Sequence, residues 1–138
     1  MKKLCLPICI VLLVVSLTVP VSAAVKDEAE LLYNNIRVIV VELRIDESTG
    51  IASSSGSVEA YYMVPVEVCA QLQVYKDGQW KTLMSWSNSG TGAAYAGGQY
   101  VVEPGYNYRT RVTGSICNDL GIPIESETET KEVYYPAS

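Results

Sequence analysis

Apolar and polar residues alternate with a period of two from residue 36 onward, which is the repeat of half-buried β-strands. No amphipathic helical pattern longer than two turns interrupts this repeat after residue 35. The stretches that we expect to form strands are 36–46, 53–64, 66–75, 80–86, 99–103, 106–116 and 125–135. Seven short strands without intervening helices predict an all-β fold, a seven-stranded antiparallel β-sandwich.

The same alternation predicts which side chains share a face of their strand. The sets expected on one face are Arg37, Ile39, Val41, Leu43 and Ile45; Val58, Ala60, Tyr62 and Val64; and Trp80, Thr82, Met84 and Trp86. Residues that favour turns separate the strands. The turns are expected at 46–50, at the Asp-Gly hairpin 76–79 and at Pro104-Gly105, with longer loops at 88–98 and 118–123.

The segment from Val102 to Val112 resembles the corner between strands E and F of fibronectin type III domains. Val102, Pro104, Gly105 and Tyr108 match that family's large aliphatic residue, Pro-Gly reversal and corner tyrosine. Segment 71–80 is similar to the hairpin between strands C and C′ of the same family. The resemblance implies a fibronectin type III or immunoglobulin-like sandwich, in which the Tyr108 hydroxyl bonds to the backbone upstream.

One feature departs from that family. Tyr61 and Tyr62 stand where fibronectin type III domains usually carry a tryptophan on strand B. The chain is also similar to a group of short secreted proteins of Gram-positive bacteria, of unknown function. That likeness rests on Gly-x-Trp-Lys at 78–81, Ser-Trp at 85–86 and Gly-Tyr-x-Tyr-Arg at 105–109. It implies no activity.

The N-terminus has the pattern of a secretory signal peptide. Lys2 and Lys3 precede an apolar run over 4–15, and small residues at 21–24 suit a signal peptidase. A transmembrane anchor is the alternative, which the prolines and the shortness of the run disfavour. We therefore expect a signal-peptide helix at 1–23, a leader at 24–34 and the sandwich domain at 35–138. The protein would then be secreted to the extracellular space, with no membrane span after cleavage.

The amino-acid composition excludes several kinds of catalysis, metal site and ligand. The chain of 138 residues has no histidine, which excludes Ser-His-Asp and Cys-His catalysis and histidine-ligated zinc. Its net charge is −5, and loss of Lys2 and Lys3 leaves 8 basic against 15 acidic residues, or −7. An acidic chain without a basic face is not expected to bind nucleic acid.

Two cysteines remain after removal of the signal peptide, Cys69 and Cys117. Strand parity points both side chains outward, and the resemblance implies that their strands are antiparallel neighbours. We expect a cross-strand disulfide on the outer face of one sheet, as suits an exported protein. Two reduced, buried thiols are the alternative.

The acidic residues of the last strand raise the question of glycosidase-like catalysis. Glu125, Glu127 and Glu129, together with Glu103, supply the carboxylates for such a pair. Acids at every second position are more typical of a solvated edge-strand face, so we do not expect an enzyme. We also expect no cofactor and no metal site, because the turn residues Asp77 and Asp119 are too dispersed to bind calcium.

The ten tyrosines and two tryptophans compensate for the absence of phenylalanine. Parity assigns Trp80, Trp86 and Tyr100 to core or half-buried positions and leaves Tyr61, Tyr75 and Tyr95 as exposed candidates for binding. The function expected first is a non-catalytic module that binds a protein or glycan at the cell surface. A carbohydrate- or envelope-binding module with an aromatic platform is the alternative, followed by a carboxylate-dependent hydrolase.

Overall fold

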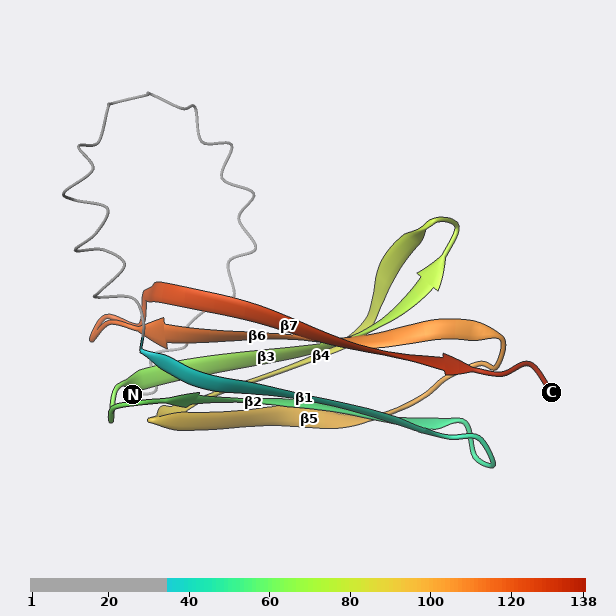
Figure 1. The fold of residues 1–138 in the computed structure, drawn as a ribbon, viewed down its shortest axis with the longest axis horizontal. Helices are drawn as coiled ribbons and strands as arrows, with labels where there is room; N and C mark the ends of the chain where they lie inside the picture. The colour runs from blue at the N-terminus through green and yellow to red at the C-terminus, as the bar shows by residue number, and fades with distance from the viewer. Residues whose placement is uncertain (1–34) are drawn as a thin grey trace, which may run out of the picture.

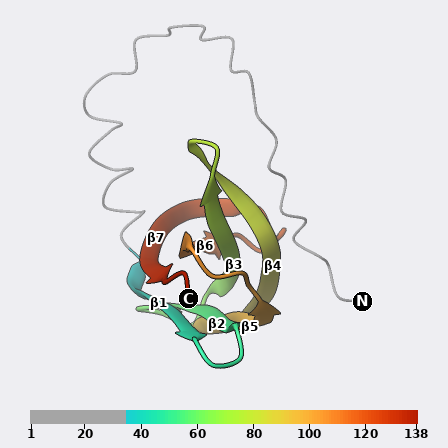
Figure 2. The ribbon, with the colours of Figure 1, turned by 90° about the vertical axis from the view of Figure 1, so that its right-hand side faces the viewer.

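The computed structural model describes residues 35–138, which form seven antiparallel β-strands in two facing sheets (Figures 1 and 2). One sheet has the order β1-β2-β5 and the other the order β4-β3-β6-β7. The strands are β1 (Ile36–Asp46), β2 (Ile51–Ala60), β3 (Pro65–Lys76), β4 (Gln79–Thr91), β5 (Ala93–Val101), β6 (Tyr106–Cys117) and β7 (Pro123–Tyr135). The predicted all-β sandwich is confirmed, and its arrangement is compatible with a fibronectin type III or immunoglobulin-like fold. The expected signal peptide and leader, 1–34, lie outside the described residues.

The core fills the space between the two sheets, and its two halves meet at Trp86. Side chains of one sheet fit against glycines of the other. A Cβ added to Gly56 on β2 would lie 2.2 Å from Val112 Cγ2 on β6, and one added to Gly114 would lie 2.7 Å from Val58 Cγ2. The missing side chains at these glycines let the sheets approach closely around the two valines.

A polar pair also crosses the core. The hydroxyls of Ser54 on β2 and Thr110 on β6 are hydrogen-bonded at 2.6 Å, and both side chains are buried. Because each hydroxyl satisfies the other, the pair joins the two sheets without an unsatisfied polar atom.

The turn between β1 and β2 confirms the reversal expected at 46–50. The hydroxyl and backbone N–H of Ser48 both donate to Asp46 Oδ1, at 2.6 and 2.9 Å. These hydrogen bonds hold the pKa of the Asp46 carboxyl below its ordinary value. Gly50 follows at a φ of 72°, a conformation that glycine adopts without strain.

Several expected strand ends are wrong. β2 ends at Ala60, so Tyr62 is exposed and does not continue the inward face. The segment 88–98 is not a loop, because β4 runs to Thr91 and β5 starts at Ala93 after a turn at Gly92. Two glycines of this segment, Gly97 and Gly98, lie inside β5, where a side chain would not fit. A Cβ on Gly98, for example, would lie 2.4 Å from the Trp86 indole nitrogen.

Two β-bulges change the expected faces. A register shift between Ile36 and Val38 turns Arg37 out to solvent, so Ile36 is the buried residue at the start of β1. In the β3–β4 pair, Gln73 lies opposite Thr82 while Leu72 lies opposite Met84, which leaves Leu83 as the extra residue. Trp80 and Thr82 therefore lie on the opposite face from Trp86, and the expectation that they share its face is wrong.

Candidate functional site

The outer face of the four-stranded sheet is a continuous polar surface, which we call the polar face. Directly opposed residues of an antiparallel pair share a face, so the strand register places its members in rows across β4, β3, β6 and β7. The rows are Thr82-Gln73-Arg109-Glu132, Ser85-Gln71-Arg111-Thr130, Ser87-Cys69-Thr113-Thr128 and Ser89-Glu67-Ser115-Ser126. These positions hold no large apolar side chain, and most of them are hydroxyls or amides.

Hydrogen bonds fix part of the polar face in place. Gln73 is 6% exposed, accepts a bond from Arg109 Nε at 2.6 Å and donates to Thr82 Oγ1 at 3.1 Å. Two hydroxyl pairs link β6 to β7, Thr113–Thr128 at 3.1 Å and Ser115–Ser126 at 2.8 Å. One end of the face is thus organised by the Gln73 amide and the other by serine and threonine.

An aromatic group borders the polar face where the β3–β4 hairpin rises away from the sandwich (Figure 1). The Tyr75 and Trp80 rings are 5.2 Å apart at a tilt of 59°, and the Arg109 guanidinium lies 4.3 Å from the Trp80 ring centroid. We call these three residues the Trp80 cluster. The bulge at Leu83 brings Trp80 to this outer face, where its side chain is half-buried.

The aromatic candidates do not form one surface. Tyr61, Tyr75 and Tyr95 are all exposed, as expected. Tyr61 lies in the β2–β3 loop at one end of the sandwich, whereas Tyr75 lies beside the hairpin tip at the other end. Tyr95 lies on the outer face of the three-stranded sheet, next to Ser57. Of the three candidates, only Tyr75 adjoins the polar face.

The expected disulfide is not present in the structure. Cys69 and Cys117, the cysteines of residues 35–138, are not joined. Cys69 lies opposite Thr113, and Cys117 is four residues further along β6. At about 3.3 Å per residue, that offset is about 13 Å, well beyond the Cα separation of about 7 Å that a disulfide spans. The two strands are indeed neighbours, but the register keeps the thiols apart.

The residues of the predicted corner have a structural role. The Tyr108 hydroxyl donates to the Glu103 carbonyl at 2.5 Å, and the ring is 2% exposed. Val102 is buried beside it, and Gly105 has a φ of 93° after the exposed Pro104. Burial raises the pKa of Tyr108 above its ordinary value, because the ionised phenolate would be poorly solvated there.

The carboxylates of β7 do not gather into a catalytic pair. Glu125 accepts bonds from the backbone N–H groups of Asn35 and Ile36, at 3.1 and 3.4 Å, and so holds the start of β1. Glu127 and Glu129 lie opposite Gly114 and Val112, on the sandwich side of β7, yet both are exposed at the open edge. Glu103 lies beyond the other end of β6 and contacts Lys76 at 3.6 Å. Within residues 35–138, no group of three or more Cys, Asp or Glu side chains is arranged to hold a metal ion.

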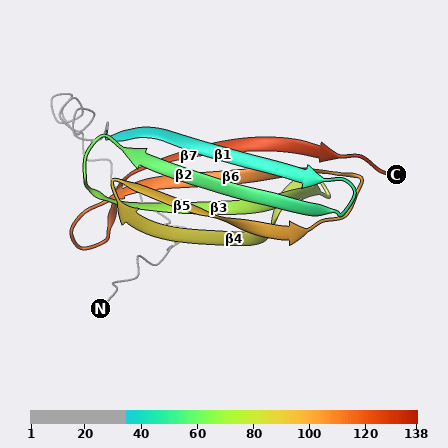
Figure 3. The ribbon, with the colours of Figure 1, turned by 90° about the horizontal axis from the view of Figure 1, so that it is seen from below.

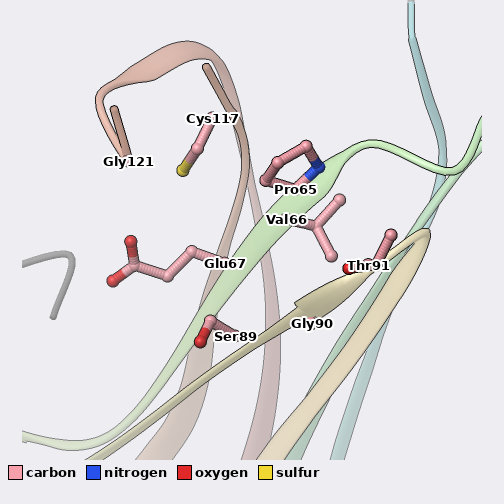
Figure 4. A pocket seen from close by; sticks show the side chains of 8 residues that line it. All are labelled: Pro65, Val66, Glu67, Ser89, Gly90, Thr91, Cys117 and Gly121. Carbon is pink, nitrogen blue, oxygen red and sulfur yellow. The ribbon is translucent and has the colours of Figure 1, made fainter. Parts of the chain in front are cut away.

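A depression of about 280 Å³ opens beside the start of β3, between the end of β4 and the β6–β7 loop. Glu67, Ser89 and Cys117 line it together with Pro65 and Gly121 (Figure 4). The depression offers a single carboxylate, that of Glu67, beside the Cys117 thiol. This depression supplies no acid–base pair.

No known family matches this chain. Comparisons with protein-family models, with curated proteins and with solved structures all gave no match. The evidence for the function of this chain therefore lies in its own sequence and geometry. In the described part of the chain, there is no helix long and apolar enough to cross a membrane.

The polar face was not among the sites predicted from the sequence. Its signal was visible in part, since Gln71 and Gln73 alternate with core residues in one strand and serines recur at 85, 87 and 89. What the sequence lacked was the bulge at Leu83, which aligns those serines and the Trp80 cluster on one face.

Proposed function

We propose that the protein is an exported, non-catalytic binding module of the fibronectin type III or immunoglobulin-like type. We further propose that its ligand is a polysaccharide of the cell envelope, bound along the polar face. The observation that supports this proposal is the four-strand width of a surface lined by hydroxyl and amide groups, with the Trp80 cluster at its margin.

Sugar chains suit this surface chemically. Their hydroxyls donate and accept hydrogen bonds, as do Gln71, Ser85 and Thr113, while tyrosine and tryptophan rings pack against the apolar faces of sugar rings. Tyr75 is 43% exposed beside Trp80 and can provide such a ring. The face carries Arg109 and Arg111 against Glu67 and Glu132, so its charges balance and an uncharged or weakly charged polymer fits it best.

The polar face is a poor match for the other classes of ligand. Protein interfaces are usually centred on buried aromatic or aliphatic anchors, and the four rows contain none. A carboxylate-dependent glycoside hydrolase uses two carboxyls that face one substrate, but on this face Glu67 and Glu132 lie in rows at opposite ends. Binding without turnover is the chemistry that the arrangement favours.

The test is retention of the exported chain on insoluble envelope polysaccharides and on a panel of soluble glycans in affinity electrophoresis. The variant Tyr75→Ala/Gln71→Ala should lose at least about fivefold in affinity, since a stacking ring and an amide each contribute about 0.5 to 1.5 kcal/mol. The matched control is Ser53→Ala/Gln99→Ala on the outer face of the three-stranded sheet, which should bind like the wild type.

Two results would overturn the proposal. One is a wild-type chain that is retained on no polymer in the panel. The other is equal loss of binding in both double variants, which would place the contact away from the polar face.

A further inference from the structure

One end of the sandwich exposes six large apolar side chains, which we call the apolar end. They are Tyr61, Tyr62 and Met63 of the β2–β3 loop, and Leu120, Ile122 and Ile124 of the β6–β7 connection and the start of β7. Their exposed fractions run from 44% to 80%, with Met63 the most exposed. Soluble proteins rarely leave so many large apolar side chains clustered in solvent, and such clusters mark contact surfaces.

Both loops are held in shape by hydrogen bonds, so the apolar side chains are presented outward. In the β2–β3 loop, Val64 N–H donates to the Tyr62 carbonyl at 2.9 Å, and Gly92 bonds to both Ala60 and Val64 at 2.8 Å. In the β6–β7 loop, the Asn118 side chain accepts the N–H groups of Leu120 and Ile122, each at 3.0 Å. A surface that keeps its form before contact binds with a smaller loss of conformational entropy.

The chain enters the domain between these two loops. The Asn35 carbonyl accepts a hydrogen bond from Tyr61 N–H at 2.9 Å, and Asn35 N–H donates to Glu125 at 3.1 Å. Figures 1 and 3 place the start of β1 at this end, with the β2–β3 and β6–β7 connections. Any segment that precedes Asn35 therefore leaves from the apolar end.

The preceding sequence identifies the partner. Residues 4–21 are predominantly apolar and follow Lys2 and Lys3, a pattern that engages a bilayer during export. The eleven residues 24–34 could span at most about 40 Å if fully extended, which would keep the apolar end close to the lipid surface while the N-terminal segment is in the membrane. We propose that the apolar end docks on a lipid bilayer surface, with Tyr61 and Tyr62 at headgroup level and Met63 and Ile122 in the acyl boundary.

The charges around this end define the kind of membrane contact. Asp119 lies within the β6–β7 loop, Glu67 lines the adjoining depression, and Arg37 is paired with Glu59 at 2.8 Å. Neither 61–64 nor 118–122 contains a lysine or arginine. The contact is thus apolar, and anionic lipid should oppose it, in contrast to the basic surfaces that anionic lipid attracts. This inference is independent of the polysaccharide proposal, because the apolar end and the polar face have different residues.

The test is co-sedimentation of the exported chain, collected from the medium of the producing cells, with phosphatidylcholine vesicles. We expect measurable partitioning that falls when phosphatidylglycerol is added and that rises again in high salt. The triple variant Tyr62→Ser/Met63→Ser/Ile122→Ser should partition at least about tenfold less, because transfer of each apolar side chain favours the bound state.

The matched control is Tyr95→Ser/Val101→Ser/Tyr134→Ser, which removes three exposed apolar side chains from elsewhere on the sandwich. It should partition like the wild type. Circular dichroism checks that each variant keeps its strand content, which is expected since all substituted positions are exposed; a Met63→Ser single variant replaces the triple variant if the latter does not fold.

Three outcomes contradict the proposal. They are no partitioning of the wild type, equal loss in the control variant, and partitioning that grows with phosphatidylglycerol. A concentration-dependent dimer that the apolar-end variant abolishes, without vesicle binding, would instead assign the surface to a second copy of the chain. If residues 24–34 shield Met63 from oxidation in the free protein, the occupant of the apolar end would instead be the leader. Each of the two would also overturn the proposal.

Discussion

At the scale of single residues, Tyr108 has the clearest role in stability. Its ring fills the core beside Val102 and Tyr135, and its hydroxyl closes the connection between β5 and β6 by bonding to Glu103. The sequence predicted this residue because the Pro-Gly reversal lies at a fixed distance before it. The Ser54–Thr110 pair, in contrast, had no sequence signal, since a serine and a threonine 56 residues apart meet only when the sheets face each other.

We predict that Tyr108→Phe lowers the free energy of unfolding by about 1 to 2 kcal/mol at neutral pH, since it removes a partly buried hydrogen bond and leaves the Glu103 carbonyl without that donor. Urea unfolding followed by fluorescence measures this change. Tyr95→Phe, at an exposed position, is the control and should change stability by less than about 0.5 kcal/mol.

The difference in the free energy of unfolding between the wild type and Tyr108→Phe should also depend on pH. Burial raises the pKa of folded Tyr108 above the value of about 10 in an unfolded chain. The resulting stabilisation is complete below the unfolded pKa and is lost as the pH rises through the folded pKa. The wild type should therefore lose its advantage over Tyr108→Phe as the pH rises above about 10. A gap that stays constant to higher pH would show that the tyrosine ionises equally in both states.

At the scale of strands, the sequence predicted that a strand exists better than it predicted where the strand ends or which face each side chain occupies. The alternation in 66–75 and 106–116 was strong enough to predict the strands β3 and β6. The extra residues at Arg37 and Leu83 left no signal, because a bulge adds one residue without breaking the composition of a strand. The same limit applied to the candidate site, where Trp80 changes faces through that one inserted residue.

The loop predicted at 88–98 was wrong for a different reason, which concerns the glycines of β5. In a sequence, glycines near 97 indicate a flexible loop, since glycine weakens a strand. In the structure, the space at Gly97 and Gly98 is occupied by the Ser55 backbone and the Trp86 ring. Only the packing partners explain why glycine is required there, and these partners are distant in sequence.

β7 shows how an edge strand keeps other strands from pairing with it. Glu127 and Glu129 lie on the sandwich side of this edge, where a strand added to β7 would have to bury them. We predict that Glu127→Val/Glu129→Val leaves the fold intact and makes the chain associate, with at least a doubling of the mass at high protein concentration in analytical ultracentrifugation.

The control for this prediction is Glu47→Val/Glu103→Val, which removes the same charge from positions outside the strands. It should remain at the mass of the wild type. Association of both variants to the same extent would mean that net charge, and not the position of the β7 acids, keeps separate molecules of the protein from associating.

At the scale of the whole molecule, no covalent link joins Cys69 on β3 to Cys117 on β6, and the described domain is held together by packing and hydrogen bonds. A disulfide closing the loop between these two residues would contribute about 4 kcal/mol in the loop-entropy model. We predict that a reducing agent changes the free energy of unfolding by less than about 0.5 kcal/mol. Urea unfolding with and without dithiothreitol checks this, and thiol titration of the unfolded chain should find both cysteines reduced. A loss of several kcal/mol on reduction would restore the disulfide expected from the sequence.

The two edge strands β1 and β7 lie side by side and run in the same direction. Asn35 contacts Glu125 near the start of both strands, and the Tyr135 hydroxyl donates to the Glu47 carbonyl near the end of both. Ile36 therefore begins β1 at one end of the long axis, and Tyr135 ends β7 at the other (Figure 1). Antiparallel ladder bonds run perpendicular to their strands, so tension between these two points would shear the bonds of each ladder together. Such tension would act on many ladder hydrogen bonds at once and not on single bonds in succession, so we expect the sandwich to resist extension along its long axis.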